Sequence, residues 1–186
     1  MKIEAIRRRA AQFGPTDAEL ADVQGIVRRE ILAMRELMQA LRPVELDSSD
    51  QLPDVLAGLV ERFRRDTGIS ARFISTGVSA SLSPAKAIEM VRIVQEALVN
   101  VRKHSNARNV LVRLGNGSGG CRLVIEDDGR GFEFAGRFSA VELDERHTGP
   151  AIIKERARVA GAELTIDSTP GSGSRVELVL NDLSHV

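Results

Sequence analysis

The spacing of apolar positions divides the chain into a helical first part and a mixed second part. From residue 17 to about 41, apolar side chains recur every three or four residues, which predicts one long amphipathic helix. The stripe consists of Leu20, Val23, Val27, Ile31, Met34, Met38 and Leu41. The opposite face is densely charged, so we expect this stripe to pack against a partner helix.

The second part alternates helical and strand-like patterns. Ser83 and Pro84 suit an N-cap and a first helical position. The predicted helices cover about 51–67, 84–104 and 150–160, and the predicted strands about 69–76, 109–114, 121–127, 162–168 and 174–180. Residues 132–148 are polar and weakly patterned, which predicts a loop. This order indicates an α+β fold, a two-layer α/β sandwich whose mixed sheet carries helices on one face.

Composition narrows the classes of function. Lys plus Arg and Asp plus Glu number 26 each, and a zero net charge argues against a general nucleic-acid binder. The single cysteine, Cys121, excludes a disulfide framework, argues against a zinc site and is expected to be a small buried residue. No apolar stretch reaches the ~18–20 residues that span a bilayer. We therefore expect a cytoplasmic chain, and leave open whether a membrane anchor belongs to the whole protein.

A group of polar residues lies on the helix predicted at 84–104. Glu96 and Asn100 are four residues apart and share a face, and Lys103 and His104 continue it or flank it. The carboxylate can act as a general base, the amide oxygen can bind a hard cation such as Mg²⁺, and the lysine can meet a phosphate. On this helix alone, an ordinary solvated polar face explains the same residues better than a site does.

A second group follows the strand predicted at 121–127. Asp127 ends that strand, and Gly129 and Gly131 follow at alternate positions. A carboxylate there can accept a hydrogen bond from an exocyclic amine such as that of adenine, and the glycines let the backbone approach a ligand. Alone, this run is also typical of an ordinary Asp-Gly turn. Its position after the Glu-x-x-x-Asn helix favours a nucleotide site.

Together these motifs resemble a known family. Residues 95–180 are similar to the ATP-binding catalytic domain of bacterial sensor histidine kinases, within the superfamily of gyrase, heat-shock chaperone and mismatch-repair ATPases. The subfamily that pairs with helix-turn-helix response regulators is the most similar. The resemblance is carried by Ile93 to Asn100 with Lys103, His104 and Ala107, by Asp127 to Phe132, by Lys154 to Ala157 with Gly161 and Ala162, and by Gly171 to Ser174. It implies a Bergerat-type ATP-binding fold preceded by a helical dimerisation segment.

The resemblance assigns roles on the helix. It implies that Glu96 is the catalytic acid that orients or deprotonates the attacking group, and that Asn100 is the Mg²⁺ ligand at ATP. Lys103 and His104 correspond to positions near the phosphates. The implied cofactors are ATP and Mg²⁺, with no other metal. A phosphate loop of the type Gly-x-x-x-x-Gly-Lys does not occur in the sequence.

It also assigns the adenine end of the site. Asp127 corresponds to the carboxylate that reads adenine, and Gly129 and Gly131 to glycines that line its pocket. Gly173 and Ser174 correspond to the closing turn, where Ser174 replaces the usual threonine but keeps a hydroxyl near the adenine.

The second glycine motif departs from the family pattern. Gly149 is retained, but Ile152 stands where a further glycine belongs, and Pro150 suits a first helical position. Ile152 is expected either to crowd the approach of phosphate to the helix N-terminus or to be tolerated in this lineage. Residues 133–148 correspond to the ATP lid, whose ordering on nucleotide would exclude water.

A second departure concerns the phosphoacceptor histidine, which in this subfamily is followed by Asp or Glu. His104, His147 and His185 are followed by Ser105, Thr148 and Val186, so none fits. We expect residues 1–43 to be part of a dimerisation hairpin lacking this histidine, residues 44–68 a linker and first catalytic-domain helix, and residues 69–186 the ATP-binding catalytic domain. The implied partners are a response regulator and the chain's own dimerisation helix in a homodimer, with no nucleic acid.

Two other functions remain open at this point. A degenerate kinase would bind nucleotide or dimerise without catalysis, in keeping with Ile152 and the missing histidine. A serine/threonine kinase of the anti-sigma type shares the ATP-binding fold but lacks the dimerisation hairpin. The hairpin-like helix at residues 17–43 therefore argues against this class.

Overall fold

The computed structural model describes Ala5 and residues 17–40, Leu46, 48–77, 82–117 and 120–181. The chain divides into two compact units, residues 1–43 and 44–186, which we describe separately. In the first, α2 covers Asp17–Ala40, close to the predicted range, and Leu20, Val27 and Ile31 of its apolar stripe are exposed. Apart from Ala5, the expected helix end at 1–13 lies outside the described residues, as does His185.

The second unit contains the remaining elements. They are a 3-10 turn η1 (Ser49–Gln51), α3 (Leu52–Thr67), β1 (Ser70–Ser75), α4 (Pro84–Asn100), a π-helical turn η2 (Val101–Ser105), β2 (Asn109–Gly117), β3 (Gly120–Asp127), β4 (Gly136–Ser139), α5 (Ala140–Glu145), α6 (Ala151–Ala160), β5 (Glu163–Ser168) and β6 (Ser174–Asn181). The helices and strands predicted from 51 onward are confirmed to within a few residues at each end.

The loop predicted at 132–148 is wrong, because this segment contains β4 and α5. Helix α5 begins with a capping box in which Ser139 and Glu142 bond reciprocally, and Leu143 is completely buried. The helix has only 6 residues, too few for an apolar period to show in the sequence. The four-residue β4 is stabilised by antiparallel pairing with β5, a partner distant in the sequence.

Local signals explain where the helices begin and end. The Ser83 hydroxyl accepts a hydrogen bond from the Lys86 amide at 3.3 Å, which caps α4 ahead of Pro84. Gly68 and Gly161 end α3 and α6 in the left-handed region, at φ 74° and 66°.

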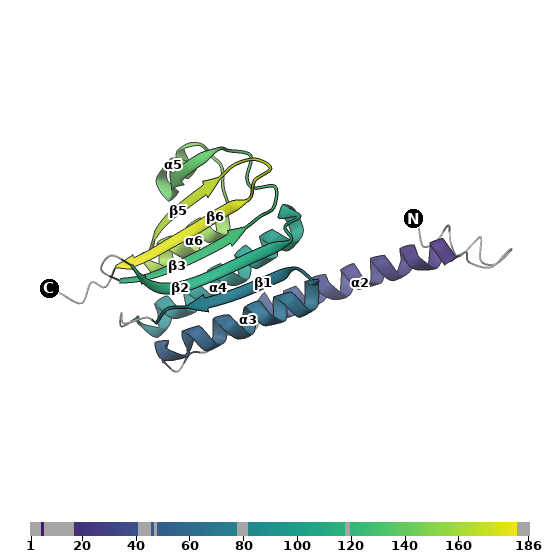
Figure 1. Ribbon diagram of the computed structural model, residues 1–186, viewed down its shortest axis with the longest axis horizontal. Helices are drawn as coiled ribbons and strands as arrows, with labels where there is room; N and C mark the ends of the chain where they lie inside the picture. The colour runs from purple at the N-terminus through teal and green to yellow at the C-terminus, as the bar shows by residue number, and fades with distance from the viewer. Residues whose placement is uncertain are drawn as a thin grey trace. The chain divides into compact units, whose positions relative to one another are not determined.

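The six strands form one sheet in the order β1-β2-β3-β6-β5-β4 (Figure 1). β1 and β2 are parallel because helix α4 connects them, and every other pair in the sheet is antiparallel. The mixed sheet and the α+β class predicted from the sequence are therefore confirmed.

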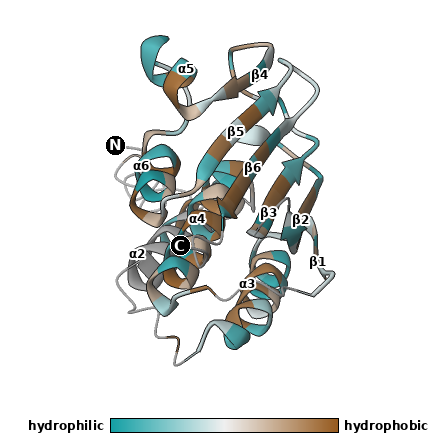
Figure 2. Cartoon of the chain, turned by 90° about the vertical axis from the view of Figure 1, so that its left-hand side faces the viewer, coloured by the Kyte–Doolittle hydropathy of each residue, from teal (hydrophilic) through white to brown (hydrophobic). Residues whose placement is uncertain are grey.

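Helices α3, α4 and α6 cover one face of the sheet, and the apolar residues of both layers meet between them (Figure 2). The core is aliphatic, as the low aromatic content requires, and its fully buried members include Leu56, Met90, Ile93, Leu123, Ile166 and Leu178. Each such side chain contributes about 1.5–3 kcal/mol on burial. Cys121 is buried here as expected, and desolvation raises the pKa of its thiol to about 11.

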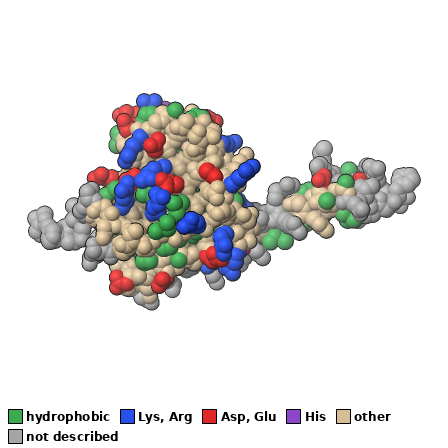
Figure 3. All heavy atoms as spheres, viewed as in Figure 1, with side chains coloured by type: hydrophobic (Ala, Val, Ile, Leu, Met, Phe, Trp, Pro, Cys, Tyr) green, Lys and Arg blue, Asp and Glu red, His purple; other side chains and the backbone are tan. Residues whose placement is uncertain are grey.

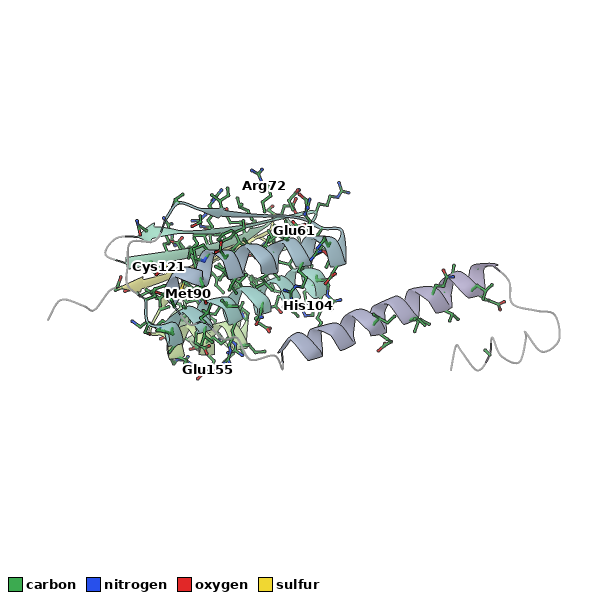
Figure 4. The ribbon with its side chains drawn as sticks, turned by 90° about the horizontal axis from the view of Figure 1, so that it is seen from below. Glu61, Arg72, Met90, His104, Cys121 and Glu155 are labelled. Carbon is green, nitrogen blue, oxygen red and sulfur yellow. The ribbon has the colours of Figure 1, made fainter. Side chains whose placement is uncertain are left out.

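The other face of the sheet carries charged side chains (Figure 3). Glu177 on β6 pairs with Arg122 at 2.7 Å and with Arg175 at 3.2 Å, and Glu126 on β3 pairs with Arg113 at 2.8 Å. Val124, which strand alternation places on this face, is only 4% exposed beneath them. Arg72 on β1 likewise points away from the helical layer (Figure 4).

No helix in the described part of the chain is long and apolar enough to cross a membrane.

Candidate nucleotide-binding site

Helix α4 and the turn that follows it carry the predicted polar group. It passes directly into the π-helical turn η2, so Glu96, Asn100 and His104 follow one another along a continuous helical segment. The Ser105 hydroxyl ends this segment by donating to the Val101 carbonyl at 2.8 Å and accepting from the Ala107 amide at 3.1 Å. The chain then turns back into β2.

Asp127 is held at the end of β3 through both of its carboxylate oxygens. Oδ2 accepts a hydrogen bond from the Ser174 hydroxyl at 2.6 Å, and Oδ1 accepts from the Gly129 amide at 2.9 Å. The side chain is part-buried. These two contacts fix the plane of the carboxylate and leave lone pairs for a further donor.

Two glycines interlock the loop after Asp127 with the turn before β6. Gly131 has φ +68°, and a Cβ there would lie 2.6 Å from the Gly173 carbonyl oxygen. Gly173 has φ +91°, and a Cβ there would lie 2.1 Å from the Asp127 carbonyl oxygen. Both positions therefore require glycine.

Asp128 anchors the same loop to the start of β2. One carboxylate oxygen accepts from the Arg108 and Asn109 amides, both at 2.8 Å, and the other accepts from the Asn109 side-chain amide at 2.7 Å. These bonds hold the pKa of Asp128 below its ordinary value, and the bond from the Asn109 side chain has the largest effect. The second aspartate of the motif thus supports the loop from outside the pocket.

A pocket of about 490 Å³ lies between these elements. Its lining includes six of the predicted site residues, namely Asn100, His104, Asp127, Gly131, Gly149 and Ser174. Aliphatic side chains supply further walls, among them Val101, Ile125, Ile153 and Val176. An apolar slot with a carboxylate and a hydroxyl at one side suits a planar base that carries an amino group.

Four predicted residues lie outside the pocket lining. Glu96 is half-buried one helical turn before Asn100, Lys103 is exposed on η2, and Gly129 and Gly173 support the loop that carries Asp127. These four residues are near lining residues in the sequence, but they do not form part of the cavity wall.

Several lining residues were not predicted as site residues, including Arg130 and Phe132 of the glycine motif and Glu133 and Thr148 of the predicted lid. Arg130 stands between two predicted glycines. Its backbone amide donates a hydrogen bond to the Ser105 carbonyl at 2.7 Å, and its carbonyl accepts one from the Gly171 amide at 2.6 Å. Its position inside the glycine motif was the available signal, but no pattern indicates where such a side chain points.

Ile152 is half exposed and is not a lining residue, whereas the neighbouring Ile153 is buried and lines the pocket. Whether Ile152 crowds the approach of phosphate to the N-terminus of α6 or is tolerated there stays a prediction. Its exposure outside the pocket lining supports the second alternative.

The segment predicted to be the lid, residues 133–148, is attached to the pocket through aromatic rings. Phe132 stacks on Phe134 with ring centroids 5.3 Å apart, and Phe134 meets Phe138 edge to face at 5.5 Å. The Arg146 guanidinium lies 4.4 Å from the centroid of Phe138. A pocket residue is thereby linked to β4 and to the end of α5.

The fold and this pocket define a class, an ATP-binding domain whose site lies between one helix layer and the strand ends of a mixed sheet. The sequence profile of the histidine kinase-, DNA gyrase B- and HSP90-like ATPase family matches residues 85–183. The chain belongs to this family and contains the ATP-binding catalytic domain of sensor histidine kinases.

Individual relatives agree with this assignment. The chain is 30% identical over 158 residues to the signal transduction histidine-protein kinase/phosphatase DegS of Brevibacillus brevis, covering 85% of this chain and 39% of DegS. It is 33% identical over 147 residues to the sensor histidine kinase LiaS of Bacillus subtilis, covering 78% of this chain and 38% of LiaS. The chain thus spans less than half the length of these two relatives.

A solved structure supports the fold. The ATP-binding domain of PrrB from Mycobacterium tuberculosis matches with a TM-score of 0.56 at 23% identity, covering 72% of this chain and 95% of that domain.

Proposed function

We propose that this chain is the catalytic part of a two-component sensor histidine kinase. The whole enzyme transfers the γ-phosphoryl group of ATP to a histidine and then to an aspartate of a response regulator, in the cytoplasm. The observation that carries the proposal is that Asn100, His104, Asp127 and Ser174 line one pocket in a domain of this family.

Asp127 recognises the adenine in this proposal. Its carboxylate is already oriented by the Ser174 hydroxyl and the Gly129 amide, and it accepts a further hydrogen bond from the exocyclic amine. Ser174 takes the place of the usual threonine without loss, because its hydroxyl reaches the carboxylate.

The residues present fit a magnesium ion that is held mainly by ATP. No cluster of three or more His, Cys, Asp or Glu side chains suited to a metal occurs among the described residues, whereas Asn100 offers one amide oxygen at the pocket. Mg²⁺ keeps several waters and takes phosphate oxygens, so one protein ligand suffices. The ion would neutralise charge between the β- and γ-phosphates.

Glu96 and the basic residues complete the proposed chemistry. Glu96, one turn before Asn100 and outside the pocket wall, orients or deprotonates the incoming histidine. His104 lines the pocket and stabilises phosphate charge, with Lys103 beside it. Catalysis then rests mainly on positioning and charge stabilisation.

We assign the remaining segments by the same reasoning. Residues 1–43 are part of the dimerisation hairpin, 44–68 the linker and first helix, and 69–186 the catalytic domain. The exposed Leu20, Val27 and Ile31 of α2 would face a partner helix in a four-helix bundle of the homodimer.

The test is phosphoryl transfer in trans. The chain is incubated with Mg²⁺ and γ-labelled ATP, alone and with a polypeptide that carries the acceptor helix of a related sensor kinase. We expect acid-labile phosphohistidine on the added polypeptide only, and none with the Glu96→Gln variant. Clear labelling of this chain alone, or failure to label several related acceptor helices despite nucleotide binding, would contradict the proposal.

A further inference from the structure

Lys154 on α6 is a buried lysine with two partners on the lid. The residue is 9% exposed, and lysine is almost never buried without a partner. Its Nζ lies 2.6 Å from Asp144 Oδ1 on α5 and donates to the Thr148 carbonyl at 2.8 Å. One ammonium group therefore connects α6 both to the lid helix and to the end of the lid.

These bonds reach the edge of the pocket. Thr148, Gly149 and Pro150 all line the cavity, and Lys154 does not. The Lys154 backbone amide also donates to the Pro150 carbonyl at 3.0 Å. The Lys154 side chain thus holds this run at Thr148, while the first backbone bond of α6, which does not depend on the side chain, holds it at Pro150.

Few other contacts fix this run among the described residues. The Thr148 amide donates to the carbonyl of Leu143, the buried residue of α5, at 3.0 Å. Arg158 also pairs with Asp144, at 2.8 Å, but its side chain is 59% exposed and it pairs with Glu155 as well. Exposed ion pairs contribute little, whereas a buried ammonium that donates to a carbonyl fixes both groups.

We infer that Lys154 is a positioning residue for nucleotide: without touching the ligand, it fixes Thr148, Gly149 and Pro150 as one wall of the pocket. The inference rests on the nucleotide site described above. An ordered wall lowers the conformational cost of binding, so loss of Lys154 weakens nucleotide binding by loosening the wall.

The experiment compares Lys154→Met with the matched control Arg158→Met, which removes the exposed partner of the same aspartate. Calorimetry measures ADP affinity, thermal unfolding measures stability, and amide hydrogen exchange measures local order in the protein without nucleotide. We expect Lys154→Met to bind ADP about tenfold more weakly and Arg158→Met to stay within about twofold of the parent. Exchange at Thr148 and Gly149 should be faster in Lys154→Met, with β3 and β6 unchanged.

Two further variants keep the outcome decisive. Lys154→Arg keeps the charge and the donors and should recover part of the affinity, and Asp144→Asn, which leaves the Thr148 bond intact, should have a smaller effect. If Lys154→Met does not fold, Lys154→Gln is measured in its place. A folded Lys154 variant that binds ADP like the parent, or equal losses in the Lys154 and Arg158 variants, would overturn the inference. If the parent protein itself binds no ADP, the proposed function is contradicted instead.

Discussion

Asp127 and Ser174 are direct register partners across the β3–β6 pair, and the Ser174 hydroxyl donates to the Asp127 carboxylate at 2.6 Å. The strand register thus sets the orientation of the side chain that is proposed to read adenine. With Gly129 bonded to the other oxygen, the carboxylate has little freedom to rotate.

Removal of this hydroxyl should weaken adenine recognition. We expect Ser174→Ala to bind ADP about 3- to 10-fold more weakly, because a hydrogen bond to a charged group contributes roughly 1 kcal/mol or more. Ser174→Thr keeps the hydroxyl and should bind within about twofold of the parent. Calorimetric titration measures both, and equal affinity of Ser174→Ala and the parent would show that Asp127 needs no such support.

The interlocked glycines should tolerate no side chain. Gly131→Ala places a Cβ 2.6 Å from the Gly173 carbonyl oxygen at a positive φ, and should cost about 2–3 kcal/mol of unfolding free energy together with nucleotide binding. The control is Gly58→Ala, in the middle of α3 with nothing within 4 Å, which should gain about 0.5–1 kcal/mol. Denaturant unfolding distinguishes the two, and a neutral Gly131→Ala would contradict the tight packing of this loop.

Restoring the family glycine should not improve the site. Ile152→Gly removes a half-exposed side chain that lies outside the pocket, so ADP affinity should stay within about twofold while stability falls by about 0.5 kcal/mol. Ile153→Val removes one methylene from a pocket-lining residue and should lower the free energy of unfolding by about 0.5–1.5 kcal/mol. It should change ADP affinity more than Ile152→Gly does. A marked gain of affinity in Ile152→Gly would mean that the isoleucine does obstruct the nucleotide.

Asp128 should make stability depend on acid. Its folded-state pKa is lowered by the bonds from Asn109 and Arg108, so its stabilising effect is complete above the unfolded-state pKa of about 3.9 and is lost as pH falls through the folded-state pKa. The difference in unfolding free energy between the parent and Asp128→Asn should therefore be larger at pH 7 than at pH 3. Asp144 and Glu142, whose pKa values are also lowered, are common to both proteins and cancel. A difference that does not change with pH would contradict this.

Much of the fold could be predicted because its signals are local. Ser83 with Pro84 predicts a helix start that the structure confirms, and Gly68 and Gly161 stand where α3 and α6 end. β4 and α5 could not be predicted, since β4 depends on pairing with β5 and α5 on burial of Leu143 and on the Ser139 cap, all contacts beyond a short periodic pattern.

The site shows the same division. Motif spacing led to Asn100 and Asp127, and the family resemblance led to Ser174; all three line the pocket. The placement of Arg130 and the role inferred for Lys154 depend on tertiary contacts, and a lysine on a short charged helix is indistinguishable in sequence from a solvated one.

ATP binding in this pocket through Asp127 can be measured by calorimetric titration of ADP or a non-hydrolysable ATP analogue, with and without Mg²⁺. We expect the parent to bind both nucleotides, and to bind the triphosphate analogue more tightly with Mg²⁺. We also expect Asp127→Asn to bind at least about tenfold more weakly, because the substitution puts an NH₂ donor where the adenine amino group needs an acceptor oxygen. A folded parent that binds no nucleotide, or an Asp127→Asn variant that binds as the parent does, would contradict it.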